Sequence, residues 1–445
     1  MIRNVHGTAI GKGNTGVPPT NGTTARFREL LSVLGPWLPA VAFLGRMPAA
    51  MCPIGTLLLV GAETGSVGDA ALVSGALALG EATGGPFVGR LADRRGQRTV
   101  VLTASLVNAT AILALVAAAV TDRPVALQIV FAAVVGLTVP QVGPLARGRW
   151  LSMVKGRPDE ERLIGSALSF DGTTDEVSFT LGPAVTGVLA TLVAPAPAMV
   201  LAAVLVGVCG ALFAVHPSAP AGSGPPAGGR GSGSLMTPTL ALLLCSMSMQ
   251  GLLFGSVQAG VSATTAHLGS PGAAGLIYAL LGGASALVGI ATAALPARIG
   301  LPLRLRLATC ALLVASLPLL VADSMVSLAL AVPLVGAAVA PHLITVFGLT
   351  ERIVARERIG EAMAMLVSSV LVAQSVGVIF AGRLADAYGP GAPFVVSCAA
   401  TATAALVAAA TATSGRYRPA APAVPAGAPL LTPPPASSPP ARPEC

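Results

Sequence analysis

The chain has 445 residues, of which 54% are hydrophobic and only 10% are charged. Soluble domains are about one quarter charged, and a large soluble helical protein would need charged faces on its helices, so this composition excludes that class. The net charge of +8 comes from short basic clusters between apolar runs rather than from one basic patch, so we expect no nucleic-acid partner.

Apolar segments follow one another along the chain, and several exceed the roughly 18 residues that indicate a membrane-spanning helix. Each must be helical, because lipid cannot satisfy open backbone hydrogen-bonding groups. We expect an all-α membrane protein with twelve transmembrane helices, at residues 33–60, 67–88, 99–120, 125–146, 164–193, 197–215, 237–262, 273–295, 306–322, 326–349, 361–382 and 391–413.

Polar stretches divide the chain into two six-helix halves. The expected parts are an N-terminal segment (1–32), a first half (33–215), a linker (216–236), a second half (237–413) and a Pro- and Ala-rich tail (414–445). The tail cannot bury a core and is predicted to be disordered. Faint matches, such as Gly182–Met199 with Gly377–Phe394, favour two pseudo-symmetric halves, a layout found in many secondary transporters.

The orientation follows from Lys and Arg in the loops. Sixteen of them lie in the loops after the even-numbered segments, against only Arg123 and Arg383 after the odd-numbered ones. By the positive-inside rule, the first set of loops and both termini are cytoplasmic. We expect a multi-pass protein of the cell membrane.

The loop after the second segment reads GRLADRRGQR, from Gly89 to Arg98. It resembles the signature loop of the major facilitator superfamily, G-x-L-A-D-R-x-G-x-[RK], at the place where that family carries it. The matching residues are Gly89, Leu91, Ala92, Asp93, Arg94, Gly96 and Arg98. The resemblance implies the superfamily's fold over about residues 30–413.

In that family the loop acts as a latch that is closed in the outward-facing state. Asp93 would accept hydrogen bonds from free N–H groups at the start of the eleventh helix, near Glu361–Ala364, while Arg94 and Arg98 hold it or contact anionic lipid. The alternative is a charged turn that only fixes topology. The corresponding loop of the second half, LPARIG, has Ala297 in place of the Asp, so we expect no latch there.

The fifth segment carries three acids, Asp171, Asp175 and Glu176, in LSFDGTTDEVSFTLGP. A start of the helix after them would leave about 16 residues, too few to span comfortably. Acids at membrane depth cost about 2.5–3.5 kcal/mol each and are functional candidates. Arg46 lies at a similar depth, so we expect it to pair with Asp175 or Glu176, either for proton coupling or substrate binding or as a static ion pair. One Arg cannot neutralise three acids, so at least one carboxyl is expected to be protonated or open to cavity water.

Helical spacing separates the acids. Asp171 and Asp175 share a face with Gly182, whereas Glu176 lies about 100° round the helix. If the Gly182 face packs on another helix, Glu176 is the better cavity candidate. We favour Glu176 for the cavity, with Asp175 next, and expect Asp171 to line only the cytoplasmic mouth. The stretch with Gly182, Pro183 and Gly187 resembles the G-P-x-x-G-G stretch of the superfamily's twelve-helix bacterial drug/proton antiporters, from which Thr186 departs.

Two further polar residues follow a proline inside an apolar segment. They are Gln141 in the fourth segment and His342 in the tenth. Each is a candidate cavity residue, and each could equally be a hydrogen-bonded interior residue.

The sequence has no nucleotide-binding loop and no metal-ligand spacing, so we expect no cofactor, no metal and no enzyme activity. Energy would come from an ion gradient. The favoured function is proton-coupled efflux of a small apolar or amphiphilic compound, such as a drug or secondary metabolite, by a monomer in the lipid bilayer, which would confer antibiotic resistance. The alternatives are proton-coupled uptake of a small metabolite and a non-transporting membrane sensor or scaffold.

Overall fold

The computed structural model describes residues 30–157, 159–220, 235–293, 299–355 and 358–413. The predicted tail, most of the linker and nearly all of the N-terminal segment lie outside these residues. The described helices are α2 (Trp37–Thr64), α3 (Val67–Arg95), α4 (Gln97–Val120), α5 (Val125–Leu137), α6 (Val142–Val154), α7 (Glu160–Leu192), α8 (Pro195–Val215), α9 (Pro238–His267), α10 (Ala273–Ala293), α11 (Leu301–Ser316), η1 (Leu317–Val321), α12 (Met325–Ile353), α13 (Ile359–Tyr388) and α14 (Ala392–Thr413).

Within the described ranges, 11 helical stretches are long and apolar enough to cross a membrane, with α5 and α6 forming one stretch and α11 and η1 another. The 33-residue helix α7 is the remaining traverse, and its acids make it less apolar. Together these give the twelve traverses predicted from the sequence, with all described elements helical.

The fourth traverse is broken, which the sequence did not predict in this form. Its first part, α5, ends at Leu137, and Gln141 has a positive φ of 50° as the residue before α6. Pro140 lies in the break and has no N–H for an α-helical bond. Asn108 of α4 donates to the carbonyl of Val135 at 2.6 Å, which satisfies an acceptor next to the break. The traverse then continues to Val154, so Arg147 and Arg149 are helical rather than in a loop.

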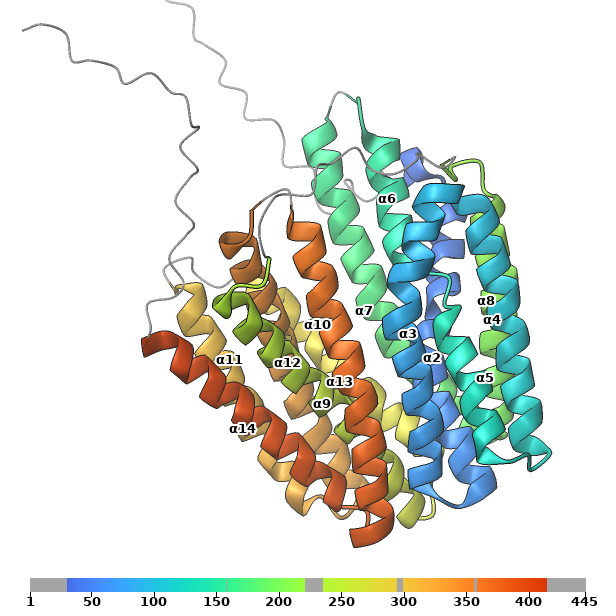
Figure 1. Ribbon diagram of the computed structural model, residues 1–445, viewed down its shortest axis with the longest axis vertical. Coiled ribbons are helices and arrows are strands. Elements are labelled where there is room, and N and C mark those ends of the chain that lie inside the picture. The colour runs from blue at the N-terminus through green and yellow to red at the C-terminus, as the bar shows by residue number, and fades with distance from the viewer. Residues whose placement is uncertain (1–29, 158, 221–234, 294–298, 356–357, 414–445) are drawn as a thin grey trace, which may run out of the picture.

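The two halves are separate bundles in Figure 1, coloured blue to green and yellow to red. We call the end that carries the α3–α4 and α6–α7 connections the inner end, after the orientation predicted from loop charge, and the opposite end the outer end. The N-terminus of α3 and the C-terminus of α13 come together at the outer end (Figure 1).

The apolar core is shared between the halves only toward the outer end. There, Ile54 and Leu58 of α2 lie in one cluster with Leu253 and Val257 of α9. Toward the inner end, one cluster of described residues runs from Leu30 to Ala214, and another from Leu243 to Ala408, so each belongs to a single half. Close packing between the halves is therefore concentrated at the outer end.

Glycines on one face of α7 show how the halves diverge. A Cβ on Gly187 would lie 2.6 Å from the backbone nitrogen of Leu276 in α10, so the two backbones touch. Gly172 and Gly165 lie on the same face, nearer the inner end, and a Cβ there would have nothing within 4 Å. The space between α7 and α10 at this level is the interhalf gap.

Helices α3 and α13 diverge in the same direction. Gly75 of α3 abuts Ile379, whereas Gly89, two heptads further along the same face, has nothing within 4 Å of an added Cβ. The molecule is thus closed between its halves at the outer end and open at the inner end.

We predict that Gly187→Ala lowers the thermal unfolding midpoint, because the new methyl group would force two backbones apart at a cost of about 1–3 kcal/mol. The matched control is Gly172→Ala, which places a methyl group on the same helix face in open space and removes a flexible glycine from a helix. Equal midpoints for the two purified variants would contradict this packing.

Candidate functional site

The acids of α7 are placed by the packing of α7 on α2. A Cβ on Gly182 would lie 2.7 Å from the Cβ of Ala50 and 3.3 Å from the nitrogen of Met51. The Gly182 face therefore packs against α2, and it carries Asp171 and Asp175 with it toward Arg46. The sequence analysis predicts that, with the Gly182 face packed on another helix, Glu176 is the better cavity candidate, and this packing is the one observed.

Two arginines and two aspartates form a closed network. Arg46 of α2 donates to Asp175 Oδ1 at 2.6 Å and to Asp171 Oδ1 at 3.1 Å. Arg147 of α6 donates to Asp171 Oδ2 at 2.6 Å and to Asp175 Oδ2 at 3.3 Å. The charges of the four side chains balance, which is the condition for keeping them at membrane depth.

Asp171 is the centre of this network, which corrects the prediction that it lines only the cytoplasmic mouth. Its side chain is 0% exposed, and besides both arginines it accepts a hydrogen bond from Trp150 Nε1 at 3.1 Å. Distance along α7 alone puts Asp171 near the cytoplasmic end of the traverse, but α2 and α6 cover this position and bury the side chain. Gly143 of α6 borders the network, since an added Cβ would be in van der Waals contact with Asp175 Oδ1 at 3.4 Å.

Arg147 and Trp150 are the site residues that sequence reasoning missed. Arg147 was assigned to a loop because the apolar run ends at residue 146. The available signal was the spacing of three between Arg147 and Trp150, which puts both on one face if the helix continues to Val154. Arg46 alone would leave one aspartate unbalanced, and Arg147 removes that deficit.

Glu176 is not part of the network, so the predicted alternative of an Arg46–Glu176 pair is wrong. The side chain is exposed, on the face of α7 that also holds Gly172 and Pro183 and looks into the interhalf gap. Three acids thus have two environments on one helix: two aspartates held by arginines, and one glutamate facing open space.

Gln141 lies at the break between α5 and α6. Its amide nitrogen is 3.1 Å from the position that a Cβ on Gly85 would take, so the side chain lies against α3. The residue is half-buried. Broken helices line the binding sites of many transporters, which keeps Gln141 a candidate cavity residue.

His342 of α12 is fully buried and bonded at both ring nitrogens. Nε2 lies 2.8 Å from Ser246 Oγ, and Nδ1 contacts Gln250 Oε1, both on α9. An amide oxygen only accepts, so Nδ1 donates to Gln250, and the Ser246 hydroxyl can pair with Nε2 as donor or acceptor. This arrangement ties α12 to α9 and matches the interior-residue alternative in the present conformation.

Arg149 of α6 contacts the signature loop through Gln97. Its Nε donates to Gln97 at 2.9 Å, a terminal nitrogen donates to the carbonyl of Phe213 at 2.6 Å, and its guanidinium carbon lies 3.7 Å from the centroid of the Phe213 ring. Gln97 belongs to the loop, so Arg149 fixes the α3–α4 connection against α8. Burial and the nearby charge of Arg149 lower the pKa of His216, at the inner end of α8.

Among the described residues, Asp93 of the predicted latch has no side-chain hydrogen bond or ion pair. Asp93, Arg94 and Arg98 are exposed, and α13 begins at Ile359, close to the predicted start. With the inner end open, an open inner latch is what the predicted mechanism requires. The latch itself stays a prediction.

The family model of the Major Facilitator Superfamily matches residues 40–366, more than half of the chain. The chain belongs to the major facilitator superfamily. Comparison with curated proteins gave no match.

Several solved transporters share this superfamily fold. A structure of the nucleoside transporter NupG has a TM-score of 0.67 at 12% identity, covering 84% of this chain and 98% of that one. A peptide transporter POT in complex with sulfate gives 0.64 at 15% identity, covering 88% and 96%. The human organic anion transporter MFSD10 (TETRAN) gives 0.54 at 19% identity, covering 87% and 98%.

Family membership makes this chain a multi-pass secondary transporter for a small molecule. At these identities the likeness extends to the fold alone, and the three neighbours differ in what their names say they carry. The site of this member therefore has to be argued from its own residues.

We predict that Arg46→Met lowers the free energy of unfolding by about 3–5 kcal/mol, because it leaves buried carboxylate charge uncompensated. Arg147→Met should cost less, since that side chain is 48% exposed and water can replace part of its effect. Thermal unfolding of both purified variants checks the order. A larger loss for Arg147→Met would contradict the assignment of Arg46 as the buried partner.

Proposed function

We propose that this transporter exports a small apolar or amphiphilic compound in exchange for protons. The observation that carries the proposal is the contrast within α7: Asp171 and Asp175 are neutralised by two arginines, while Glu176 faces the interhalf gap. Proton coupling needs a carboxyl that opens to one side of the membrane and then to the other. Glu176 lies on the interface between the halves, where rocking of the halves changes exposure most.

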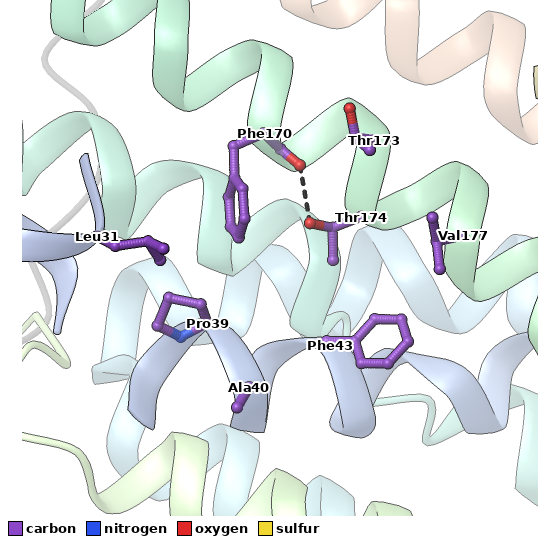
Figure 2. A pocket seen from close by; sticks show the side chains of 8 residues that line it. All are labelled: Leu31, Pro39, Ala40, Phe43, Phe170, Thr173, Thr174 and Val177. Carbon is purple, nitrogen blue, oxygen red and sulfur yellow. Dashed lines mark hydrogen bonds between the residues drawn. The ribbon is translucent and has the colours of Figure 1, made fainter. Parts of the chain in front are cut away.

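The chemistry of the transported compound is inferred from the surroundings of the site. Figure 2 shows a pocket between α2 and α7, lined by Leu31, Pro39, Ala40, Phe43, Phe170, Thr173, Thr174 and Val177. Its volume is about 520 Å³. Except for two threonine hydroxyls the lining side chains are apolar, and Thr174 already donates its hydroxyl hydrogen to the carbonyl of Phe170 at 2.7 Å. Such a surface favours apolar solutes, which supports the apolar or amphiphilic class.

The arginines bear on the charge of the transported compound. Arg147 is 48% exposed while bonded to both aspartates. Its partners hold its charge, so a free anion would have to compete with two carboxylates at bonding distance. This favours a substrate without a strong negative charge.

Export is the direction that we propose, and the present conformation is compatible with it. With the inner end cytoplasmic, the present conformation is open to the cytoplasm, where an exporter collects its substrate. Glu176 would release its proton here and bind another when the outer end opens. In resistant bacteria such export would lower the internal concentration of a drug.

We predict that Glu176→Gln abolishes transport driven by a pH gradient and leaves compound binding intact, because glutamine keeps the shape of the side chain and cannot carry a proton. Gradient-driven transport is measured in everted vesicles with an acidic interior, as accumulation of the amphiphilic dye Nile red inside the vesicles. Fluorescence titration of the purified protein with the same dye measures compound binding.

Glu161→Gln is the matched control, because Glu161 is an exposed acid on the same helix near the inner end. Undiminished gradient-driven transport by Glu176→Gln would overturn the assignment of Glu176. Dye movement into right-side-out rather than everted vesicles would favour uptake, and absence of gradient-driven movement of any compound in the unmodified protein would favour a sensor or scaffold.

A further inference from the structure

The sequence GRLAD occurs twice in the chain, at Gly89–Asp93 and at Gly382–Asp386. The first copy lies near the C-terminus of α3 and belongs to the signature loop at the inner end. The second lies near the C-terminus of α13, at the outer end, and not in the loop of the second half that corresponds to the first copy. The two copies are thus carried by two helices that pack against each other.

The second copy caps the helix that carries the first. Asp386 Oδ2 accepts from Ser66 Oγ at 2.8 Å and from the backbone nitrogen of Gly68 at 2.9 Å, and Oδ1 accepts from the backbone nitrogen of Val67 at 3.1 Å. Val67 and Gly68 are the first residues of α3, whose N–H groups have no partners within the helix. A carboxylate at this place also interacts favourably with the positive end of the helix dipole.

The helices are closely fitted around this contact. A Cβ on Gly382 would collide with the Cβ of Ala71, so no other residue lets α13 approach α3 as closely. About two turns toward the centre from Gly382, Ser375 Oγ donates to the carbonyl of Gly75 at 2.6 Å. Arg383 Nη2 lies 3.7 Å from Asp69 Oδ1 of α3. This arginine, counted from the sequence as a loop residue, is part of α13 and of the interface.

The two aspartates stand in reciprocal positions. Asp386 ends α13 and caps α3 at the outer end, while Asp93 ends α3 and is predicted to cap α13 at the inner end. In the present conformation Asp386 is bonded and Asp93 is exposed. Helices α3 and α13 touch at Gly75 and diverge before Gly89, so closing one end separates the other.

We propose that Asp386 is an outer latch that holds the transporter closed to the outside, and that it alternates with Asp93 during the cycle. In each conformation one of the two aspartates then caps the N-terminus of the opposite helix: Asp386 caps α3 when the outer end is closed, and Asp93 caps α13 when the inner end is closed. This proposal rests on alternating access by the transporter and not on the identity of the coupling ion or of the substrate.

The test is a measurement of outer opening in the full chain reconstituted in lipid vesicles. A single cysteine replaces Ser262 in a cysteine-free background, because Ser262 is 6% exposed and lines a small cavity of about 180 Å³ between the halves at the outer end. Its reaction rate with a membrane-impermeant maleimide reports the fraction of molecules that are open to the outside.

Asp386→Asn should raise this rate about fivefold, because it removes the carboxylate charge at the helix N-terminus, worth up to about 1 kcal/mol, and turns one acceptor oxygen into a donor. Gly382→Val should raise it too, because the larger side chain keeps α13 from Ala71. Asp93→Asn should lower the rate, since it removes the predicted latch of the opposite conformation. Asp323→Asn is the matched control, an exposed aspartate before α12 at the same end.

An unchanged rate in both Asp386→Asn and Gly382→Val would overturn the proposal, as would an equal rise in Asp323→Asn. The labelling needs neither a pH gradient nor a substrate. A failure of the outer latch is therefore distinguishable from a failure of proton coupling at Glu176.

Discussion

The buried carboxylate of Asp171 is the constraint on which the N-terminal half depends. A charge at membrane depth has no water to solvate it, so its partners must come from other helices. Arg46 supplies one from α2, and Arg147 and Trp150 supply two from α6. To bring them together, α6 must run on past the apolar stretch and α7 must approach α2 at Gly182. The position of three helices follows from this one requirement.

The same network divides the acids in the middle of α7 into two that are bonded to arginines and one that is exposed. Because two arginines satisfy two aspartates, the acid that remains, Glu176, is the one that is free to respond to its surroundings. It lies on the face that carries the interface between the halves, whereas the aspartates lie on the face that packs within the half. A difference of one residue, about 100° round a helix, thus separates a carboxylate bonded to two arginines from an exposed one.

Small residues control how the halves meet. Gly187 against α10 and Gly382 against α3 allow backbone contact at the outer end, and further along the same two interfaces Gly172 and Gly89 face open space. Without a hydrophobic driving force between helices in lipid, such close contacts and the hydrogen bonds that they permit supply much of the association energy. In this conformation the close contacts between the halves therefore lie at the outer end.

The sequence by itself determined the number of traverses, their orientation relative to one another, the superfamily and the helix on which the acids lie. These follow from local physics: the length of apolar runs, loop charge and helical period. It also indicated Arg46 as a partner, from depth alone. Only the tertiary structure decided that Arg147 completes the network, that Asp171 is buried, that Glu176 is exposed and that Asp386 caps α3. Those facts depend on the rotation of each helix and on contacts between residues as far apart as Ser66 and Asp386, and nothing in a local pattern specifies which faces of two distant helices will meet.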